Sequence, residues 1–122
     1  MSRQRLLPSP AHPITVTPTR KRVTATVGDL VVADTANALT LQESTYPAVQ
    51  YIPLDDVDRS VLERTDTQTY CPFKGDASYY SVKTADGDLV DAVWTYEQPY
   101  DSVADIAGHV AFYPNKVAVT VG

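Results

Sequence analysis

Residues 71–76 gather the side chains of this sequence that are best suited to chemistry. Cys71 is the one cysteine of the chain, and Lys74 follows three residues later. The thiolate is the reactive form of cysteine, and a nearby cation favours it. Cys71 and Lys74 are therefore the candidates for a catalytic role, although the catalytic residue stays unknown. Cys71 also fits a small apolar residue that is buried at the start of a turn.

Lys74 lies between Phe73 and Gly75, in a part of the chain that has few basic residues. Gly75 allows the backbone to turn sharply or to approach a ligand closely. Lys74 could bind an anion, or it could pair at a pocket with Glu43, which ends a run rich in apolar residues. The alternatives are a solvated turn lysine and an exposed or capping carboxylate at Glu43.

Aromatic side chains form the other part of the candidate site. Trp94 and Tyr96 share one face of a predicted strand, because strand side chains alternate with period two. Tyr79 lies across the same predicted hairpin. These rings either pack in the core or line a small-molecule cleft that holds a few polar groups. The predicted ligand-binding residues, arranged around the 71–76 turn, are Glu43, Lys74, Tyr79, Trp94 and Tyr96.

The single cysteine and the two histidines limit metal chemistry. One cysteine permits no intramolecular disulfide and no cysteine-based structural zinc site. A pair between Cys71 and His109, or a three-ligand site that adds a carboxylate, would need a proximity that the sequence does not show. The other histidine, His12, lies in the N-terminal arm. We therefore predict no metal and no cofactor.

Charge divides the chain into a basic start and an acidic remainder. Residues 1–22 carry five basic side chains and no acidic one, whereas residues 23–122 carry five basic and all fifteen acidic side chains, a net charge of −10. Such a body repels phosphate backbones, so we expect no nucleic-acid partner. Residues 1–13, which contain Arg3, Arg5 and three prolines, are expected to form a flexible arm.

Membrane and export signals are weak in this sequence. No apolar run is long enough for a membrane-spanning helix, and no signal-like stretch follows the first arginines. Together with the single cysteine, this pattern predicts a cytoplasmic protein without a membrane partner. The expected partner is a small-molecule ligand, and the expected oligomeric state is a monomer or a homodimer.

Period-two alternation recurs along the chain, and valine, threonine and tyrosine are abundant, which is typical of half-buried strands. We therefore predict a single domain over residues 14–122 with a mainly β fold, a compact sheet or barrel-like structure that has one or two short helices. The predicted strands cover residues 14–17, 23–27, 30–34, 38–43, 49–52, 65–70, 77–84, 89–96, 110–113 and 117–121.

Helical spacing of apolar residues is confined to short windows. It predicts one helix over residues 56–64, which Asp55 or Asp56 would cap. A single helical turn is expected within residues 99–107.

Two short segments recur in the same order. The letters GDLV occur at residues 28–31 and again at 87–90, and VQYIP at 49–53 resembles VAFYP at 110–114. The two spacings are nearly equal, which favours two pseudo-repeated β halves. Chance similarity between hairpin sequences is the alternative.

Three segments resemble one known family. Residues 51–53 (YIP), 69–79 (TYCPFKGDASY) and 94–96 (WTY) resemble the bacterial domain-of-unknown-function family 427, with CPFKG as the most specific part. The likeness extends over nearly the whole chain. It implies a small, mainly β domain whose function is not established and which is sometimes labelled nucleotidyltransferase-like.

The carboxylates allow that label to be tested. Nucleotidyl transfer of the polymerase type needs paired carboxylates that hold two Mg²⁺ ions and a loop that grips the triphosphate. The pairs Asp56/Asp58 and Asp86/Asp88 are better explained by helix capping and by turn chemistry. The five glycines do not cluster, so there is no phosphate-binding loop. The motifs therefore do not support the label.

These observations predict a β domain that binds a small polar or anionic ligand in an aromatic-lined pocket near the 71–76 turn. One alternative is an enzyme that uses Cys71 or Lys74. The other is a protein-interaction module that pairs through an exposed strand edge.

Overall fold

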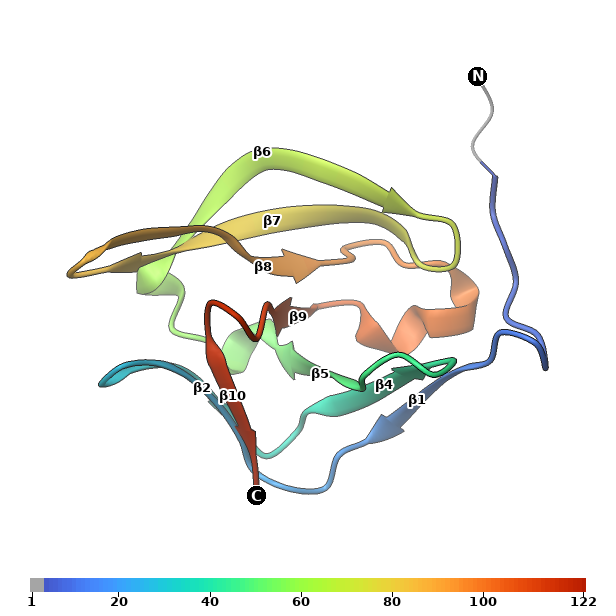
Figure 1. Ribbon diagram of the computed structural model, residues 1–122, viewed down its shortest axis with the longest axis horizontal. Helices are drawn as coiled ribbons and strands as arrows, with labels where there is room; N and C mark the ends of the chain where they lie inside the picture. The colour runs from blue at the N-terminus through green and yellow to red at the C-terminus, as the bar shows by residue number, and fades with distance from the viewer. Residues whose placement is uncertain (1–3) are drawn as a thin grey trace.

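The computed structural model describes residues 4–122, so Arg3 of the predicted arm lies outside the described residues. The chain forms two antiparallel sheets (Figure 1). The larger has seven strands in the order β1-β4-β5-β9-β8-β7-β6, and it stays open over the described residues because β1 and β6 are its edges. Its strands are β1 (Ile14–Pro18), β4 (Leu39–Glu43), β5 (Val49–Pro53), β6 (Leu62–Cys71), β7 (Gly75–Thr84), β8 (Gly87–Thr95) and β9 (His109–Phe112).

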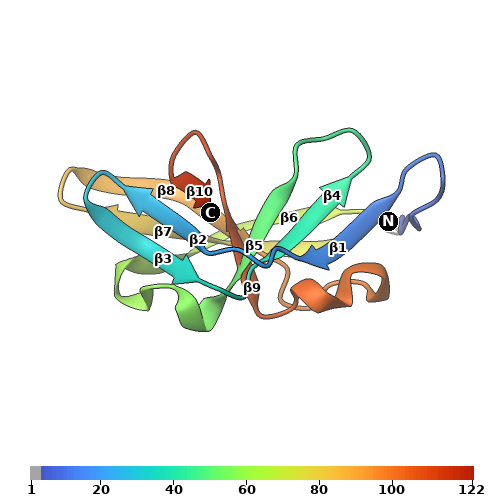
Figure 2. The same ribbon diagram turned by 90° about the horizontal axis from the view of Figure 1, so that it is seen from below.

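The smaller sheet has the strand order β10-β2-β3. The β2–β3 hairpin and the β1–β4 pair lie toward opposite ends of the molecule, as Figure 2 shows. Its strands are β2 (Val23–Val27), β3 (Leu30–Thr35) and β10 (Ala118–Val121).

The predicted mainly β fold is confirmed, and each predicted strand overlaps an observed one. The alternation that predicted the strands appears directly in their burial. In β2, Val23 and Ala25 are fully buried, whereas Thr24 between them is partly exposed. Burying one face of a strand and solvating the other is what period two requires.

The single helix predicted over residues 56–64 is wrong. Two short 3-10 helices, η1 (Leu54–Asp56) and η2 (Arg59–Val61), take its place. Val57, between them, is buried and forms an isolated β-bridge with Ala33. Asp58 N also donates a hydrogen bond to the carbonyl of a β3 residue, at 2.7 Å. These contacts with β3 hold the backbone extended where a helix would need it coiled.

The caps of these turns also differ from the prediction. Asp58, rather than Asp55 or Asp56, caps η2, because its carboxylate accepts a hydrogen bond from Ser60 N at 3.1 Å. The helical turn expected within residues 99–107 is confirmed as the 3-10 helix η3 (Asp101–Ile106). No helix in the described part of the chain is both long and apolar enough to cross a membrane.

The recurring segments form similar local structures in different sheets. Residues 28–31 turn the β2–β3 hairpin of the smaller sheet, whereas residues 87–90 begin β8 in the larger sheet. The other recurring pair, β5 and β9, lies side by side and antiparallel. The two halves of the chain therefore meet at the β5–β9 pair, but their hairpins do not occupy equivalent positions.

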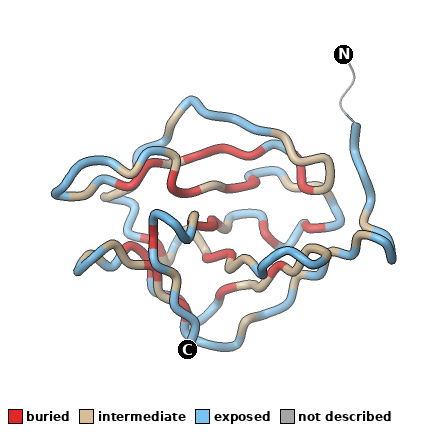
Figure 3. Tube along the Cα trace, viewed as in Figure 1, coloured by how far each residue is buried: buried red, intermediate tan, exposed pale blue. Residues whose placement is uncertain are grey.

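Most buried residues lie in the strands, as Figure 3 shows. Their side chains form two clusters. The first cluster consists mainly of small aliphatic residues from both sheets. The second contains three tyrosines, whose hydroxyl groups bring polar atoms to the edge of the core. Its members are Leu41, Tyr51, Ala77, Tyr79, Tyr96, Val103, Ile106 and Ala111.

Candidate functional site

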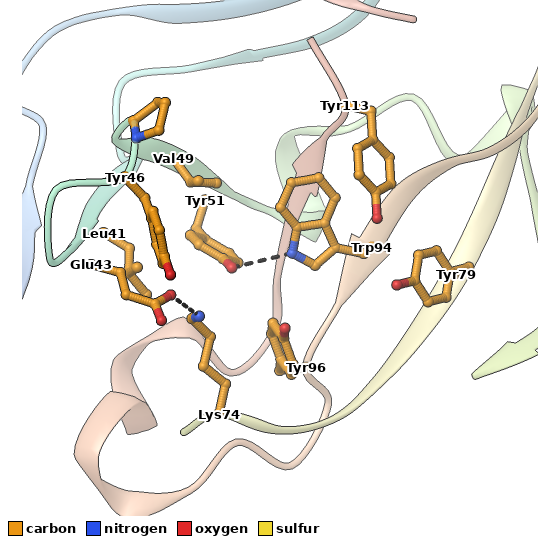
Figure 4. Close-up of a pocket in the computed structure, with 11 residues that line it drawn as sticks. Leu41, Glu43, Tyr46, Val49, Tyr51, Lys74, Tyr79, Trp94, Tyr96 and Tyr113 are labelled. Carbon is orange, nitrogen blue, oxygen red and sulfur yellow. Dashed lines mark hydrogen bonds and ion pairs between the residues drawn. The ribbon is translucent and has the colours of Figure 1, made fainter. Parts of the chain in front are cut away.

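A pocket of about 410 Å³ opens beside the second core cluster (Figure 4). Its walls come from β4 and β5 with the loop between them, the β6–β7 turn, β7, the end of β8, and the residue after β9. All five residues of the predicted set line it, so the structure brings together Glu43, Lys74, Tyr79, Trp94 and Tyr96. The other lining residues are Leu41, Tyr46, Pro47, Val49, Tyr51 and Tyr113.

The turn between β6 and β7 positions Lys74. Lys74 N donates a hydrogen bond to the Cys71 carbonyl at 3.1 Å, and the Lys74 carbonyl accepts one from Tyr100 N at 2.9 Å. Gly75 then has a φ of 111°, which strongly favours glycine. A side chain at Gly75 would come within 3.4 Å of the Gln98 carbonyl oxygen. The close approach that Gly75 permits is therefore to the backbone after β8.

The Lys74 side chain points into the protein and forms an ion pair with Glu43, across 31 positions of sequence (Figure 4). Lys74 is only 7% exposed, which excludes the solvated-lysine alternative. A buried ammonium group is tolerated in a protein when an opposite charge and hydrogen bonds compensate for the lost water. Glu43 supplies that compensation.

Glu43 has a partner at each carboxylate oxygen. Lys74 Nζ contacts Oε1, and His12 Nε2 lies 2.8 Å from Oε2. Burial opposes ionisation of Glu43, but the hydrogen bonds with Lys74 and His12 outweigh it, so the pKa of Glu43 lies below its ordinary value. The carboxylate is therefore charged at neutral pH, and the exposed-end alternative for Glu43 does not hold.

Trp94 forms the centre of the aromatic wall. Its Nε1 donates a hydrogen bond to the Tyr51 hydroxyl at 3.2 Å, and its ring centroid lies 4.5 Å from that of Tyr113. Tyr79 is the direct partner of Trp94 in the β7–β8 ladder, and the Tyr79 hydroxyl lies 2.8 Å from Thr69 Oγ1. These contacts fix the rings, so the pocket wall is preformed.

Three of the lining tyrosines resist ionisation. Burial raises the pKa of Tyr51 and of Tyr96 well above the ordinary value. Burial, assisted by the neighbouring Tyr79 hydroxyl, raises the pKa of Tyr113 to about 12. All three hydroxyl groups are therefore protonated at neutral pH and can donate hydrogen bonds.

Two of these donors are unused by the protein. The Tyr51 hydroxyl accepts from Trp94, but no described residue accepts its own hydrogen. No hydrogen bond joins the Tyr96 hydroxyl to another side chain or backbone group within residues 4–122. Both side chains are nearly buried, and their oxygens face the pocket (Figure 4). A molecule in the pocket would meet two hydroxyl donors set in an aromatic wall.

The catalytic candidates Cys71 and Lys74 are close to each other, with Lys74 Nζ 3.8 Å from Cys71 Sγ. Cys71 packs against the second core cluster and does not line the pocket. In the described structure, no hydrogen bond joins His109 to Cys71. The Nδ1 atom of His109 lies instead 2.9 Å from the Ala107 carbonyl oxygen. Within residues 4–122, no three histidine, cysteine, aspartate or glutamate side chains are grouped so that they could hold a metal ion.

The carboxylate pairs considered for nucleotidyl transfer have other positions. Asp56 accepts a hydrogen bond from Thr35 Oγ1 at 2.6 Å, and Asp58 caps η2. Asp86 and Asp88 lie at the β7–β8 turn. None of the four lines the pocket.

The described part of the arm, residues 4–13, runs along the 71–76 turn (Figure 1). Leu6 N donates a hydrogen bond to the Pro72 carbonyl at 2.9 Å, and the His12 ring stacks on Phe73 with centroids 4.3 Å apart. Through its contact with Glu43, His12 connects the arm to the ion pair. No pattern in the sequence indicated these contacts. The flexibility of the arm stays a prediction.

The residues at the site that the predicted set lacks are His12, Leu41, Tyr46, Pro47, Val49, Tyr51 and Tyr113. For Tyr51 a signal was present, because Val49 and Tyr51 alternate on one face of a predicted strand. Tyr46 and Tyr113 lie outside strands, where no periodicity indicates the direction of a side chain.

Family and protein comparisons bear on the whole chain. The family model described as Domain of unknown function (DUF427) matches residues 15–122. A comparison with curated proteins gives no match. The match covers nearly the whole chain, including the CPFKG segment at residues 71–75, so the predicted family is confirmed. The chain belongs to the family described as Domain of unknown function (DUF427).

Proposed function

We propose that the pocket binds a small neutral molecule that has a flat apolar part and a polar group that accepts hydrogen bonds. The observation that carries the proposal is the pair of unused donors, the hydroxyl groups of Tyr51 and Tyr96, in a wall of packed aromatic rings. The volume of about 410 Å³ supports the proposal, because small-molecule sites range from about 300 to 1,000 Å³ and combine apolar walls with a few placed polar groups.

The charges of the site favour a neutral ligand over an anionic one. Lys74 is the one basic residue among those that line the pocket, and Glu43 already neutralises it. An anion that approached Lys74 would also approach the Glu43 carboxylate, and like charges repel strongly where water is scarce. An amide or carbonyl group avoids this repulsion and still accepts hydrogen bonds from the tyrosines.

One contact favours the alternative of an enzyme, namely the 3.8 Å between Lys74 Nζ and Cys71 Sγ. A cation beside a cysteine is a common feature of nucleophilic cysteine sites. However, Cys71 lies outside the pocket lining, and an ammonium group held in an ion pair has no lone pair to offer an electrophile. The binding function therefore uses more of the observed geometry than the catalytic one.

A matched pair of probes tests the proposal. Benzamide and benzoate have the same ring and nearly the same shape, but one is neutral and the other an anion. Trp94 is the only tryptophan of the chain, so its fluorescence reports on the pocket directly. We expect benzamide to bind more tightly than benzoate at pH 7.

Two hydroxyl deletions complete the experiment. Tyr96→Phe removes one donor from the pocket and should weaken benzamide binding by about five- to tenfold, the usual value of one hydrogen bond. Tyr80→Phe removes a hydroxyl from β7 outside the pocket and should leave binding unchanged. The proposal fails if neither probe binds, if benzoate binds more tightly, or if both variants weaken binding equally.

A further inference from the structure

A second pocket, of about 300 Å³, adjoins the tyrosine-lined pocket. The two share three lining residues, Pro47, Val49 and Trp94, so the indole of Trp94 belongs to the wall of both. The rest of the second pocket comes from the start of β5, the end of β9 with Pro114, and β10. It therefore lies beside the first pocket, on the side of the smaller sheet.

The second pocket offers almost nothing to a polar group. None of its lining residues is ionisable, and the polar side-chain groups among them are the Gln50 amide and the Trp94 N–H, which is already donated to Tyr51. The Gln50 amide is engaged by two threonines, since its Oε1 accepts from Thr19 Oγ1 at 2.6 Å and its Nε2 donates to Thr40 Oγ1 at 3.1 Å. Val121, at the exposed side, keeps 44% of its surface in water. An apolar occupant would remove this surface from water without leaving a polar group unpaired.

We infer that the ligand is amphipathic, with its polar head in the tyrosine-lined pocket and an apolar tail in the second pocket. This inference rests on the proposed function of the first pocket and adds the class of ligand. The shared wall of Pro47, Val49 and Trp94 makes one molecule the natural occupant of both pockets. A head that accepts hydrogen bonds from Tyr51 and Tyr96 would direct its tail past Trp94.

A homologous series of probes tests the tail. The binding affinity of benzamide is compared with the affinities of 4-methyl-, 4-ethyl-, 4-propyl- and 4-butylbenzamide. Trp94 fluorescence measures each affinity, and calorimetry provides a second measurement. Burying one methylene group tightens binding by about fourfold. We expect affinity to rise by about that factor for each added carbon until the second pocket is full.

Two variants locate the tail. Val121→Asp places a charge at the second pocket and should abolish the gain with chain length while benzamide itself binds as before. Val31→Asp is the matched control, because Val31 is also an exposed strand valine, at 53%, in the same sheet but lines neither pocket. The gain with chain length should survive in that variant.

The outcomes separate the inference from the proposed function. If benzamide binds but longer tails do not improve affinity, or if Val31→Asp abolishes the gain as fully as Val121→Asp, the tail site is wrong and the proposed function stands. If no member of the series binds, both are wrong. If sedimentation shows a dimer that Val121→Asp dissociates, the second pocket is covered by another copy of the chain, and the inference is overturned.

Discussion

Lys74 and Glu43 depend on each other, because each neutralises a charge that the protein has largely removed from water. His12 also forms a hydrogen bond with Glu43. Among the described residues, Glu43 is the only carboxylate that pairs with Lys74. The pair also leaves the pocket lining without net charge, which is the basis for proposing a neutral ligand. An exposed lysine at this turn would contribute little to stability, but the buried position of Lys74 changes that expectation.

Lys74→Met is expected to lower the free energy of unfolding by about 3 kcal/mol, because removing one partner leaves the other charge buried without compensation. The double variant Lys74→Met/Glu43→Gln removes both charges and should recover most of the loss. Urea denaturation at pH 7 measures both proteins. A Lys74→Met protein as stable as the wild type would show that the ion pair contributes nothing in solution.

Strands such as β2 were predictable because they bury one face and leave the other partly exposed, so the alternation of residue types indicates their position. The predicted helix failed because apolar spacing alone cannot distinguish a helix from two turns separated by a buried extended residue. At Val57 the deciding contact is the bridge to Ala33, which lies 24 positions earlier in the chain. A tertiary contact of this kind leaves no local periodic signal.

The site was partly predictable from the types of residue. Lys74 stood out as a basic residue in an acidic body beside Gly75, and Glu43 as a carboxylate at the end of an apolar strand. Their pairing crosses the sheet from β4 to the β6–β7 turn. The contributions of Tyr46 and Tyr113 were not predictable, because both residues follow strands and their directions depend on how the loops fold.

The described part of the arm contacts the rest of the protein through a few residues, and His12 makes two of these contacts. His12→Ala removes the stack on Phe73 and the hydrogen bond to Glu43. We expect the Leu6 amide, which donates to Pro72, to exchange its hydrogen about tenfold faster in this variant, because these two contacts are worth roughly 1–2 kcal/mol together. Hydrogen exchange followed by NMR measures the rate.

Thr15→Ala serves as the control for the arm, since Thr15 is an exposed residue of β1 close to His12 in the chain. Its Leu6 amide should exchange as in the wild type. Equal rates in all three proteins would show that His12 does not hold the arm. A Leu6 amide without protection in the wild type would bear out the flexible arm that the sequence predicts.

The pocket belongs to the whole molecule rather than to one element. Its lining residues come from both halves of the chain, which meet at the β5–β9 pair. The rings of Tyr51, Tyr79 and Tyr96 also belong to the second core cluster. These side chains therefore stabilise the fold with their rings and also line the pocket, so ionisation of Tyr51 or Tyr96 should destabilise the entire domain.

Raising the pH should expose this coupling. The folded protein holds the pKa of Tyr51 and Tyr96 well above 10 and that of Tyr113 at about 12, whereas the unfolded chain ionises all three near 10. Their contribution to stability is therefore complete below pH 10 and is lost progressively as the pH rises above it.

Ultraviolet absorbance of tyrosinate should show fewer than the eight tyrosines of the chain ionised at pH 11 while circular dichroism stays native, and all eight in a denaturant-unfolded control. Tyr113→Phe should lower by one the number of tyrosines that stay protonated at pH 11. Ionisation of all eight tyrosines near pH 10 in a protein that keeps its native spectrum would mean that the pocket hydroxyls are open to bulk water.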